Sequence, residues 1–111
     1  MILKIKKITL IKFYTKLFCI LKKIMEKISY IVPTLNEIQN IDSTIDKIET
    51  VSNNLNIDYE IICIDGFSTD GTVEKIKNNK NFNKIKFQNQ KYLNGPSHAI
   101  MQGISIAKGN Y

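Results

Sequence analysis

The stretch Tyr59-Glu-Ile-Ile-Cys-Ile-Asp-Gly-Phe-Ser-Thr-Asp-Gly-Thr72 decides the fold. Within it, Ile61-Ile-Cys-Ile64 shows no alternation of apolar and polar side chains, which is typical of a parallel strand covered on both faces. We therefore predict a strand over residues 59–64. The turn from Asp65 to Gly71 leads into a helix predicted from about Thr72, with Asp70 as its cap.

The segment upstream repeats this order of a strand, a loop and a helix. Ile28-Ser-Tyr-Ile-Val-Pro33 is rich in β-branched and aromatic residues and ends at proline, which predicts a strand. Asn36 is predicted to cap the following helix, with Gln39 as its capping-box partner. A helix of about four turns is predicted to end at residues 53–56, because apolar residues recur at helical spacing, at Ile38, Ile41, Ile45, Ile48 and Val51.

The downstream segment adds one more strand and one more helix. Ile85-Lys-Phe87 predicts a third, weaker strand, and Gly95-Pro96 opens the last helix, where proline is tolerated. Small residues recur every four positions in this helix, which predicts close packing on the sheet; they are Ala99, Gly103 and Ala107. Lys108 and Gly109 are predicted to end the helix, and Tyr111 to begin a fourth strand. Alternating strands and helices predict an α/β fold with a Rossmann-like parallel sheet and flanking helices.

Residues 1–27 differ from the rest of the 111-residue chain in charge. They hold eight lysines against the single acid Glu26, whereas residues 28–111 hold eight lysines and nine acids. We therefore divide the chain into a basic leader, 1–27, and a nearly neutral domain, 28–111. Because the net charge of +6 belongs to the leader, a nucleic-acid-binding domain is not indicated.

The leader predicts a basic amphipathic helix. One face gathers Leu10, Phe13, Tyr14, Leu17, Leu21 and Ile24, and another gathers Lys12, Lys16, Lys23 and Lys27. Its longest uncharged stretch, 17–21, is much shorter than the roughly 20 apolar residues that span a membrane. Such a helix suits the headgroup region of an anionic membrane. Two alternatives remain open: the apolar face docks on a partner, or Met25 is the natural start.

The two cysteines, Cys19 and Cys63, form no C-x-x-C motif or Cys/His cluster. Neither a disulfide framework nor a zinc site is indicated, and a reduced, cytoplasmic setting fits best. Cys63 is most simply a small buried apolar residue.

Two loops are predicted to meet where a ligand would bind. In open parallel sheets, ligands bind beyond the carboxyl ends of the strands, and the loops 33–37 and 65–70 lie at that edge. The sequence has no G-x-G-x-x-G after its first strand and no P-loop motif, so the usual dinucleotide and P-loop sites are excluded. Glu37 and Asp65 favour a nucleoside, because carboxylates accept hydrogen bonds from a ribose diol or a uracil imide.

Three blocks of sequence resemble the amino-terminal part of family 2 glycosyltransferases with the GT-A fold. They are Ser29-Tyr-Ile-Val-Pro-Thr-Leu-Asn-Glu37, the stretch 59–72, and Gly95-Pro-Ser-His-Ala99 with Gly103-Ile-Ser-Ile-Ala-Lys-Gly-Asn-Tyr111. The resemblance covers residues 28–111 in the family's order and spacing. It implies an inverting transferase that moves a sugar from a nucleotide-sugar donor to an acceptor, in polysaccharide or glycolipid synthesis at the inner membrane face.

The resemblance also implies binding residues. In such enzymes the loop matching Pro33, Leu35 and Glu37 contacts the base and ribose, and the turn matching Asp65 faces the nucleoside. Three more residues occupy motif positions, although capping and turn formation also account for them: Asn36, Ser68 and Asp70.

This sequence departs from the family at several positions. Gly66 stands where many relatives carry a second Asp that touches the base in some of them. Ile100 and Met101 stand where Arg or Asn is frequent, which concerns a contact to the donor phosphates. His98 borders the predicted cleft and is equally explained as a polar residue in the first turn of a helix.

The family also has parts that this sequence lacks. After a segment like Ala107–Tyr111, it continues to an Asp-x-Asp-like motif that holds Mn²⁺ or Mg²⁺, then to an acceptor site and a catalytic base. We therefore expect 28–111 to be a truncated donor-binding half that contains no catalytic residue or metal ligand and is inactive alone. The alternatives are a non-catalytic nucleotide-binding module and a membrane-surface adaptor that acts through the leader.

Overall fold

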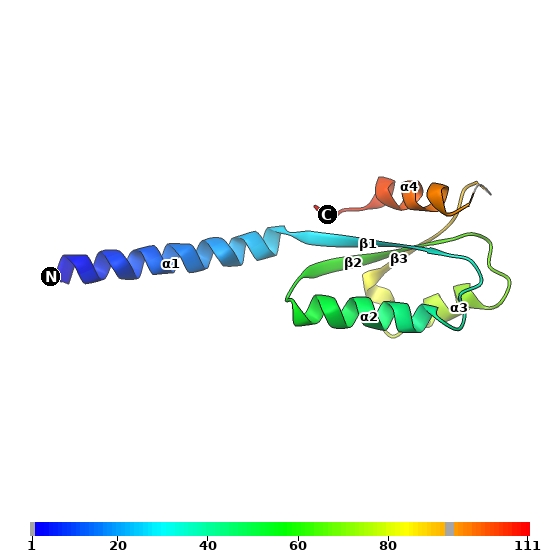
Figure 1. Ribbon diagram of the computed structural model, residues 1–111, viewed down its shortest axis with the longest axis horizontal. Helices are drawn as coiled ribbons and strands as arrows, with labels where there is room; N and C mark the ends of the chain where they lie inside the picture. Colours follow the sequence, from blue (N-terminus) through cyan, green and yellow to red (C-terminus); the bar gives the residue numbers. More distant parts are fainter. Residues whose placement is uncertain (1, 93–94) are drawn as a thin grey trace.

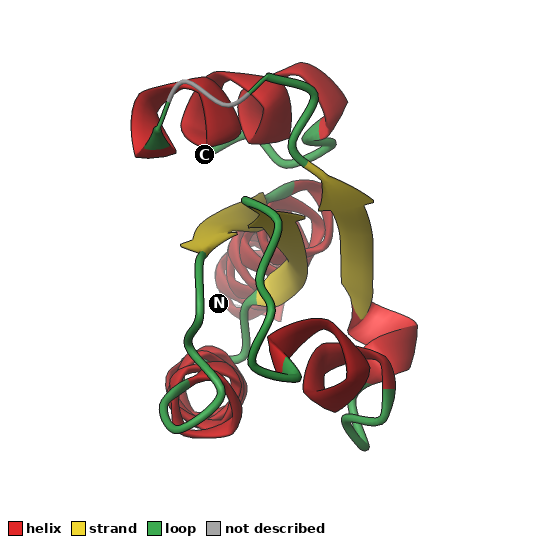
Figure 2. Ribbon diagram, turned by 90° about the vertical axis from the view of Figure 1, so that its right-hand side faces the viewer, coloured by secondary structure: helices red, strands yellow, loops and turns green. Residues whose placement is uncertain are grey.

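The computed structural model describes residues 2–92 and 95–111, with the backbone alone for 2–8 and 22–25. The elements follow one another as α1 (Ile2–Met25), β1 (Lys27–Thr34), α2 (Ile41–Asn54), β2 (Asp58–Asp65), α3 (Thr72–Lys77), the 3₁₀ turn η1 (Phe82–Lys84), β3 (Ile85–Asn89) and α4 (Pro96–Ile106). The three strands form a parallel sheet in the order β1-β2-β3. Figure 1 shows α2 and α3 on one face of the sheet and α4 on the other, and Figure 2 shows the same layers from the side. The predicted α/β fold is confirmed.

The central strand β2 carries the core of both layers. Tyr59, Ile61 and Cys63 pack with α2 and α3, whereas Ile62 and Ile64 pack with Ala99 of α4. Every residue of β2 after Asp58 is buried, which explains why the strand shows no alternation of apolar and polar residues.

The small residues of α4 let it lie close to the sheet, as predicted. Ala99 and Gly103 are buried, and a Cβ on Gly103 would stand only 2.5 Å from Cγ2 of Ile31 in β1. A larger side chain at Gly103 would push the helix away from the strand.

Two predicted helix caps are wrong. Helix α2 begins at Ile41 with Asn40 as its N-cap, and Asn36 instead has a left-handed backbone with φ 52°. The N-cap of α3 is Gly71 rather than Asp70, because the chain takes φ 96° there, a conformation that glycine adopts without strain. Asp70 still accepts a hydrogen bond from the N–H of Thr72, the first residue of α3. Helix α4 ends at Ile106, ahead of the predicted end at Lys108 and Gly109.

The C-terminal residues lie against the free edge of β1. The N–H of Ser29 donates to the carbonyl of Tyr111 at 2.9 Å, and the N–H of Tyr111 donates to the carbonyl of Lys27 at 3.4 Å. These two bonds flank Ile28 as in a parallel ladder. The described residues 107–111 are not assigned to a strand, so the fourth strand predicted to begin at Tyr111 is not observed, although Tyr111 bonds to the edge of β1.

Helix α1 projects from the end of the sheet (Figure 1), and the molecule measures 72 Å along its longest axis. The described apolar side chains of α1 are 39–68% exposed: Leu10, Ile11, Phe13, Tyr14, Leu17, Phe18, Ile20 and Leu21. Within the described residues, no helix has the length and apolar character needed to cross a membrane.

Candidate functional site

The two predicted loops lie side by side at the carboxyl ends of β1 and β2. Thr34 and Asp65, the last residues of these strands, are register partners. The Thr34 hydroxyl donates to Oδ1 of Asp65 at 2.7 Å, and the N–H of Gly66 donates to the carbonyl of Thr34 at 2.8 Å. The loops therefore leave the sheet together.

The Asp65 side chain is fully buried beneath these loops. Besides Thr34, it accepts hydrogen bonds from both the N–H and the hydroxyl of Ser68, at 2.8 Å and 2.6 Å. Its carboxylate thus fixes the turn that follows β2 and joins it to β1.

Asn36, Ser68 and Asp70 also connect the two loops. The N–H of Asn36 donates to the Ser68 hydroxyl at 2.9 Å, and the Asn36 side chain accepts from the N–H of Thr69 at 2.8 Å. Asp70 accepts from the N–H of Ile38 at 3.2 Å and from the N–H and the hydroxyl of Thr72. The Thr72 hydroxyl bond, with the backbone bonds from Thr72 and Ile38, holds the pKa of Asp70 below its usual range despite partial desolvation. These side chains keep the loops in register.

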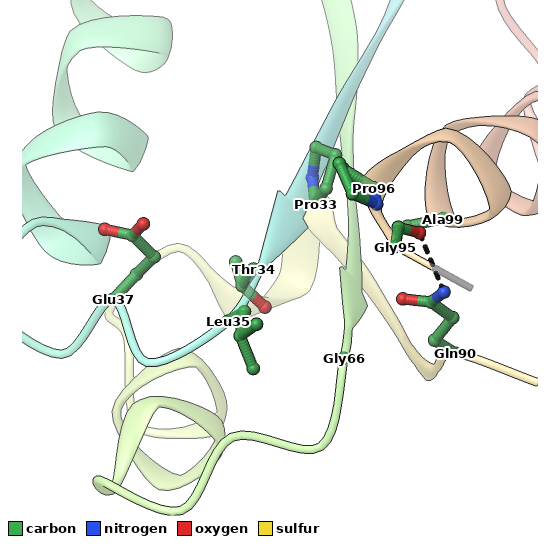
Figure 3. A pocket seen from close by; sticks show the side chains of 9 residues that line it. All are labelled: Pro33, Thr34, Leu35, Glu37, Gly66, Gln90, Gly95, Pro96 and Ala99. Carbon is green, nitrogen blue, oxygen red and sulfur yellow. Dashed lines mark hydrogen bonds between the residues drawn. The ribbon is translucent and has the colours of Figure 1, made fainter. Parts of the chain in front are cut away.

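A pocket of about 330 Å³ opens beside the joined loops, a volume within the usual range of small-molecule sites. Its walls come from the ends of all three strands and from the start of α4 (Figure 3). The lining residues are Pro33, Thr34, Leu35, Glu37, Gly66, Gln90, Gly95, Pro96 and Ala99.

Three of the seven predicted binding residues line this pocket. Leu35 is 60% exposed and Pro33 lies on the strand before it, so both present apolar surface. Glu37 stands on the side of the pocket away from Gln90 (Figure 3), and its carboxylate accepts from the Asn40 side chain at 3.3 Å. The other four, Asn36, Asp65, Ser68 and Asp70, do not line the pocket; they make the hydrogen bonds of the loops.

Gln90 is a pocket residue that the sequence analysis missed. Its N–H donates to the carbonyl of Asp65 at 2.7 Å, so it continues the alignment of β3 with β2. Its side-chain nitrogen donates to the carbonyls of Tyr92 and Gly95, at 2.6 Å and 2.9 Å. Its position in the sequence could have identified it, because Gln90 follows the third parallel strand just as the two predicted loops follow the first and second.

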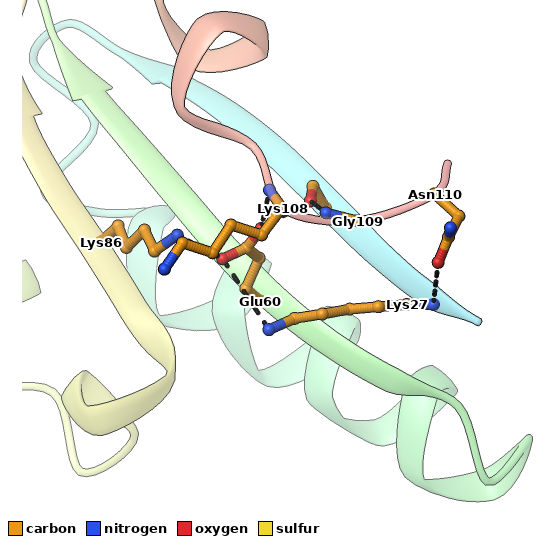
Figure 4. Close-up of polar contacts among 7 residues, drawn as sticks. Lys27, Glu60, Lys86, Lys108, Gly109 and Asn110 are labelled. Carbon is orange, nitrogen blue, oxygen red and sulfur yellow. Dashed lines mark hydrogen bonds and ion pairs between the residues drawn. The ribbon is translucent and has the colours of Figure 1, made fainter. Parts of the chain in front are cut away.

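A second polar cluster lies at the opposite end of β2, around Glu60 (Figure 4). Its Oε1 accepts from the Ser29 hydroxyl at 2.7 Å and from the N–H of Lys108 at 2.6 Å, and its Oε2 pairs with Nζ of Lys86 at 2.7 Å. Burial alone raises the pKa of Glu60, but the bonds from Lys86, Ser29 and Lys108 outweigh it and lower the pKa to about 2. This cluster holds the segment after α4 on the sheet.

The described side chains suggest neither a reactive thiol nor a metal centre in the domain. Burial, reinforced by the nearby Asp65 charge, raises the pKa of the Cys63 thiol to about 12, as expected for an inert core cysteine. Within 2–92 and 95–111, no three or more His, Cys, Asp or Glu side chains are grouped so as to hold a metal ion.

Comparisons with known proteins point to one family. A family model described as glycosyl transferase family 2 matches residues 29–111. The chain is 36% identical over 87 residues to abequosyltransferase RfbV of Salmonella typhimurium, across 76% of this chain and 26% of that protein. It is 32% identical over 84 residues to dolichol-phosphate mannosyltransferase of Pyrococcus furiosus, across 76% of this chain and 23% of that protein. The chain therefore spans about a quarter of the length of these curated relatives.

Proposed function

Because this chain belongs to glycosyl transferase family 2, we propose that residues 28–111 bind the nucleotide part of a nucleotide-sugar donor for glycosyl transfer. The pocket at the carboxyl ends of the three strands is the observation that carries this proposal. Ligands of open parallel sheets bind at this edge, and here it is the edge that holds Pro33, Leu35 and Glu37.

The chemistry of the pocket suits a nucleoside. Leu35, Pro33 and Pro96 offer apolar surface against which a base can pack, and the Glu37 carboxylate can accept hydrogen bonds from a ribose diol. The N-terminus of α4 opens on the same pocket at Gly95 and Pro96, and the positive end of a helix dipole favours the negative charge of a diphosphate.

Asp65, Ser68, Asn36 and Asp70 serve the same site indirectly. Their hydrogen bonds fix both loops before a ligand arrives, so less conformational entropy is lost on binding. We assign them a positioning role and reserve direct contact for the residues that line the pocket.

Sugar transfer itself would require groups beyond this chain. The two relatives are named for transfer of abequose and mannose, and the chain matches about a quarter of each. We propose that a full-length enzyme of this kind is an inverting transferase in polysaccharide or glycolipid synthesis, with a divalent cation held outside residues 28–111. Residues 1–111 alone would bind a donor without transferring its sugar.

Equilibrium binding tests this proposal. The 111-residue chain is titrated with UDP, CDP, GDP and ADP, and with the free nucleosides and inorganic pyrophosphate as controls. We expect at least one diphosphate to bind and pyrophosphate to bind much more weakly, because the pocket contacts the nucleoside. Binding of none of the four diphosphates would contradict the proposal.

We further propose that α1 binds an anionic membrane surface from the cytoplasmic side. Phe13, Leu17 and Phe18 are exposed on α1. The leader, residues 1–27, carries eight lysines against one acid. Apolar burial at the headgroup boundary and attraction of lysines to anionic lipid both favour such binding.

A pair of charge-matched variants tests the membrane proposal. Phe18→Glu replaces an exposed apolar side chain with a carboxylate, whereas Thr15→Glu adds the same charge at an exposed polar position, three residues from both Lys12 and Phe18. In sedimentation with phosphatidylserine-containing vesicles, we expect Phe18→Glu to weaken binding more than Thr15→Glu. Equal loss in both variants would show that charge alone matters, and absence of binding by the unaltered chain would refute the proposal.

A further inference from the structure

We infer that Gln90 determines which nucleobase the pocket accepts, by presenting a hydrogen-bond acceptor to the edge of the base. This inference rests on the proposed function. It concerns a side chain that is 6% exposed, lines the pocket and comes from the end of β3 rather than from either acidic loop.

The Gln90 side chain is held in one orientation. Its nitrogen donates to the carbonyls of Tyr92 and Gly95, and two carbonyl oxygens at 2.6 Å and 2.9 Å require the NH₂ group at that position. The oxygen Oε1 must therefore point the other way. Figure 3 shows it on the side of Gly66 and Leu35, facing the other pocket residues.

Gly66 leaves room in front of this oxygen. A Cβ at Gly66 would stand 3.2 Å from Oε1 of Gln90 and 3.5 Å from the carbonyl of Thr34. Because Gly66 has no side chain, this part of the pocket wall presents two acceptor oxygens, Oε1 of Gln90 and the carbonyl of Thr34. A larger side chain at Gly66 would extend into the space in front of the amide.

An acceptor held in this way discriminates between ligands. Because the NH₂ group of Gln90 is already used by two carbonyls, the side chain can offer the ligand only Oε1. It favours a base that presents an N–H at that point and disfavours one that presents a carbonyl oxygen or a methylated nitrogen. The backbone bond from Gln90 to Asp65 fixes the distance between this acceptor and the loops that hold the nucleoside.

The test compares binding ratios rather than single affinities. Gln90→Met removes the acceptor while keeping a side chain of similar length, and Gln88→Met, two residues earlier in β3, is the matched control. Gln88 bonds to the side chain of Gln102 and does not line this pocket. Both variants are titrated with UDP, CDP, GDP and ADP, and their folding is checked by thermal unfolding.

We expect Gln90→Met to reduce the ratio between the tightest and the weakest diphosphate by about tenfold, the value of one lost hydrogen bond. Gln88→Met should leave the ratio unchanged. Equal weakening of all four diphosphates would overturn the inference, because a merely structural role of Gln90 predicts that result.

A second measurement uses the unaltered chain and needs no variant. The diphosphate that binds best is compared with its analogue methylated at the N–H of the base edge, which we expect to bind about tenfold more weakly. Equal affinity for the two would overturn the inference. If no diphosphate binds the unaltered chain, the proposed function itself fails, and this result is distinct from a change in ratio.

Discussion

The hydroxyl of Thr34 donates a 2.7 Å hydrogen bond to the buried carboxylate of Asp65, its register partner on the adjacent strand. Two loops that are about 30 residues apart in sequence therefore start from one hydrogen-bonded pair. The remaining bonds of Asp65 go to Ser68, which in turn accepts from the N–H of Asn36. The Asp65 carboxylate thus fixes the conformation of both loops where they leave the sheet.

Replacement of Asp65 should destabilise the domain. Asp65→Ala leaves the donors of Thr34 and Ser68 without their buried acceptor, and we expect a loss of about 3 kcal/mol in the free energy of unfolding. Asp65→Asn should cost less, because its amide oxygen still accepts. Urea unfolding of each variant measures the difference.

Asp58→Ala serves as the control for this prediction, because Asp58 is an exposed aspartate at the start of the same strand. We expect its free energy of unfolding to stay near that of the unaltered chain. If Asp65→Ala were no less stable than Asp58→Ala, the carboxylate would not hold the loops.

Replacement of Glu37 should weaken ligand binding without changing stability. Glu37→Gln removes a negative acceptor from the pocket, and we expect nucleoside diphosphates to bind about tenfold more weakly. Calorimetric titration measures the change. Glu74→Gln, on an exposed part of α3, should bind like the unaltered chain, and equal affinities for the two variants would rule out a contact to Glu37.

Acid should remove the stabilisation that Glu60 provides. Its pKa is about 2 in the folded protein against 4.5 ordinarily, so the unfolded chain binds more protons between these values. The contribution is therefore complete above about pH 4.5 and is lost as the pH falls toward 2. It amounts to on the order of 2 to 3 kcal/mol for this buried carboxylate.

Glu60→Gln isolates this contribution in unfolding experiments across the acidic range. The variant should be less stable at neutral pH and lose less stability on acidification than the unaltered chain. Asp58→Asn, exposed on the same strand, should retain the steep acid dependence. A Glu60→Gln profile parallel to that of the unaltered chain would show that Glu60 is not the group responsible.

Enlargement of Gly109 should release the C-terminal residues from β1. A Cβ there would stand 2.7 Å from the backbone carbonyl of Lys27 and 2.5 Å from the Ser29 hydroxyl. We expect Gly109→Ala to cost about 1 kcal/mol of stability, because the added methyl group overlaps β1 and the C-terminal residues must move away from it. The sensitive measurement is hydrogen exchange at the Ser29 amide, which bonds to Tyr111 and should exchange faster. Unchanged exchange would contradict this packing, and Lys108→Ala is the control because its side chain is exposed.

The sheet could be predicted because the amino-acid composition of its central strand indicates that both faces of the strand are buried. Ile61 to Ile64 are apolar without a break, and they are buried on both faces between α4 and the helices opposite. The boundaries of the helices were harder to predict from the sequence. The side chain of Asn36 bonds to Thr69, 33 residues away, instead of capping its own helix, and local pattern does not report such a contact.

The location of the site followed from topology, but the roles of its residues did not. Both acidic loops lie at the expected edge and Leu35, a predicted binding residue, lines the pocket, yet Asp65 and Asp70 bond to neighbouring loop groups instead. A sequence identifies which residues carry oxygen atoms, whereas only coordinates show which of those atoms the protein itself uses. Gln90 was missed because its strand is short and no acidic residue marks its end.

The most direct test of donor binding is a nuclear magnetic resonance titration of the isotopically labelled 111-residue chain with the four nucleoside diphosphates. If a donor binds in this pocket, we expect saturable shifts at the amides of Leu35, Gly66 and Gln90, and little change around Ser29 and Glu60 at the opposite end of the sheet. Saturable shifts centred on Ser29 and Glu60, with Leu35 and Gly66 unmoved, would contradict it.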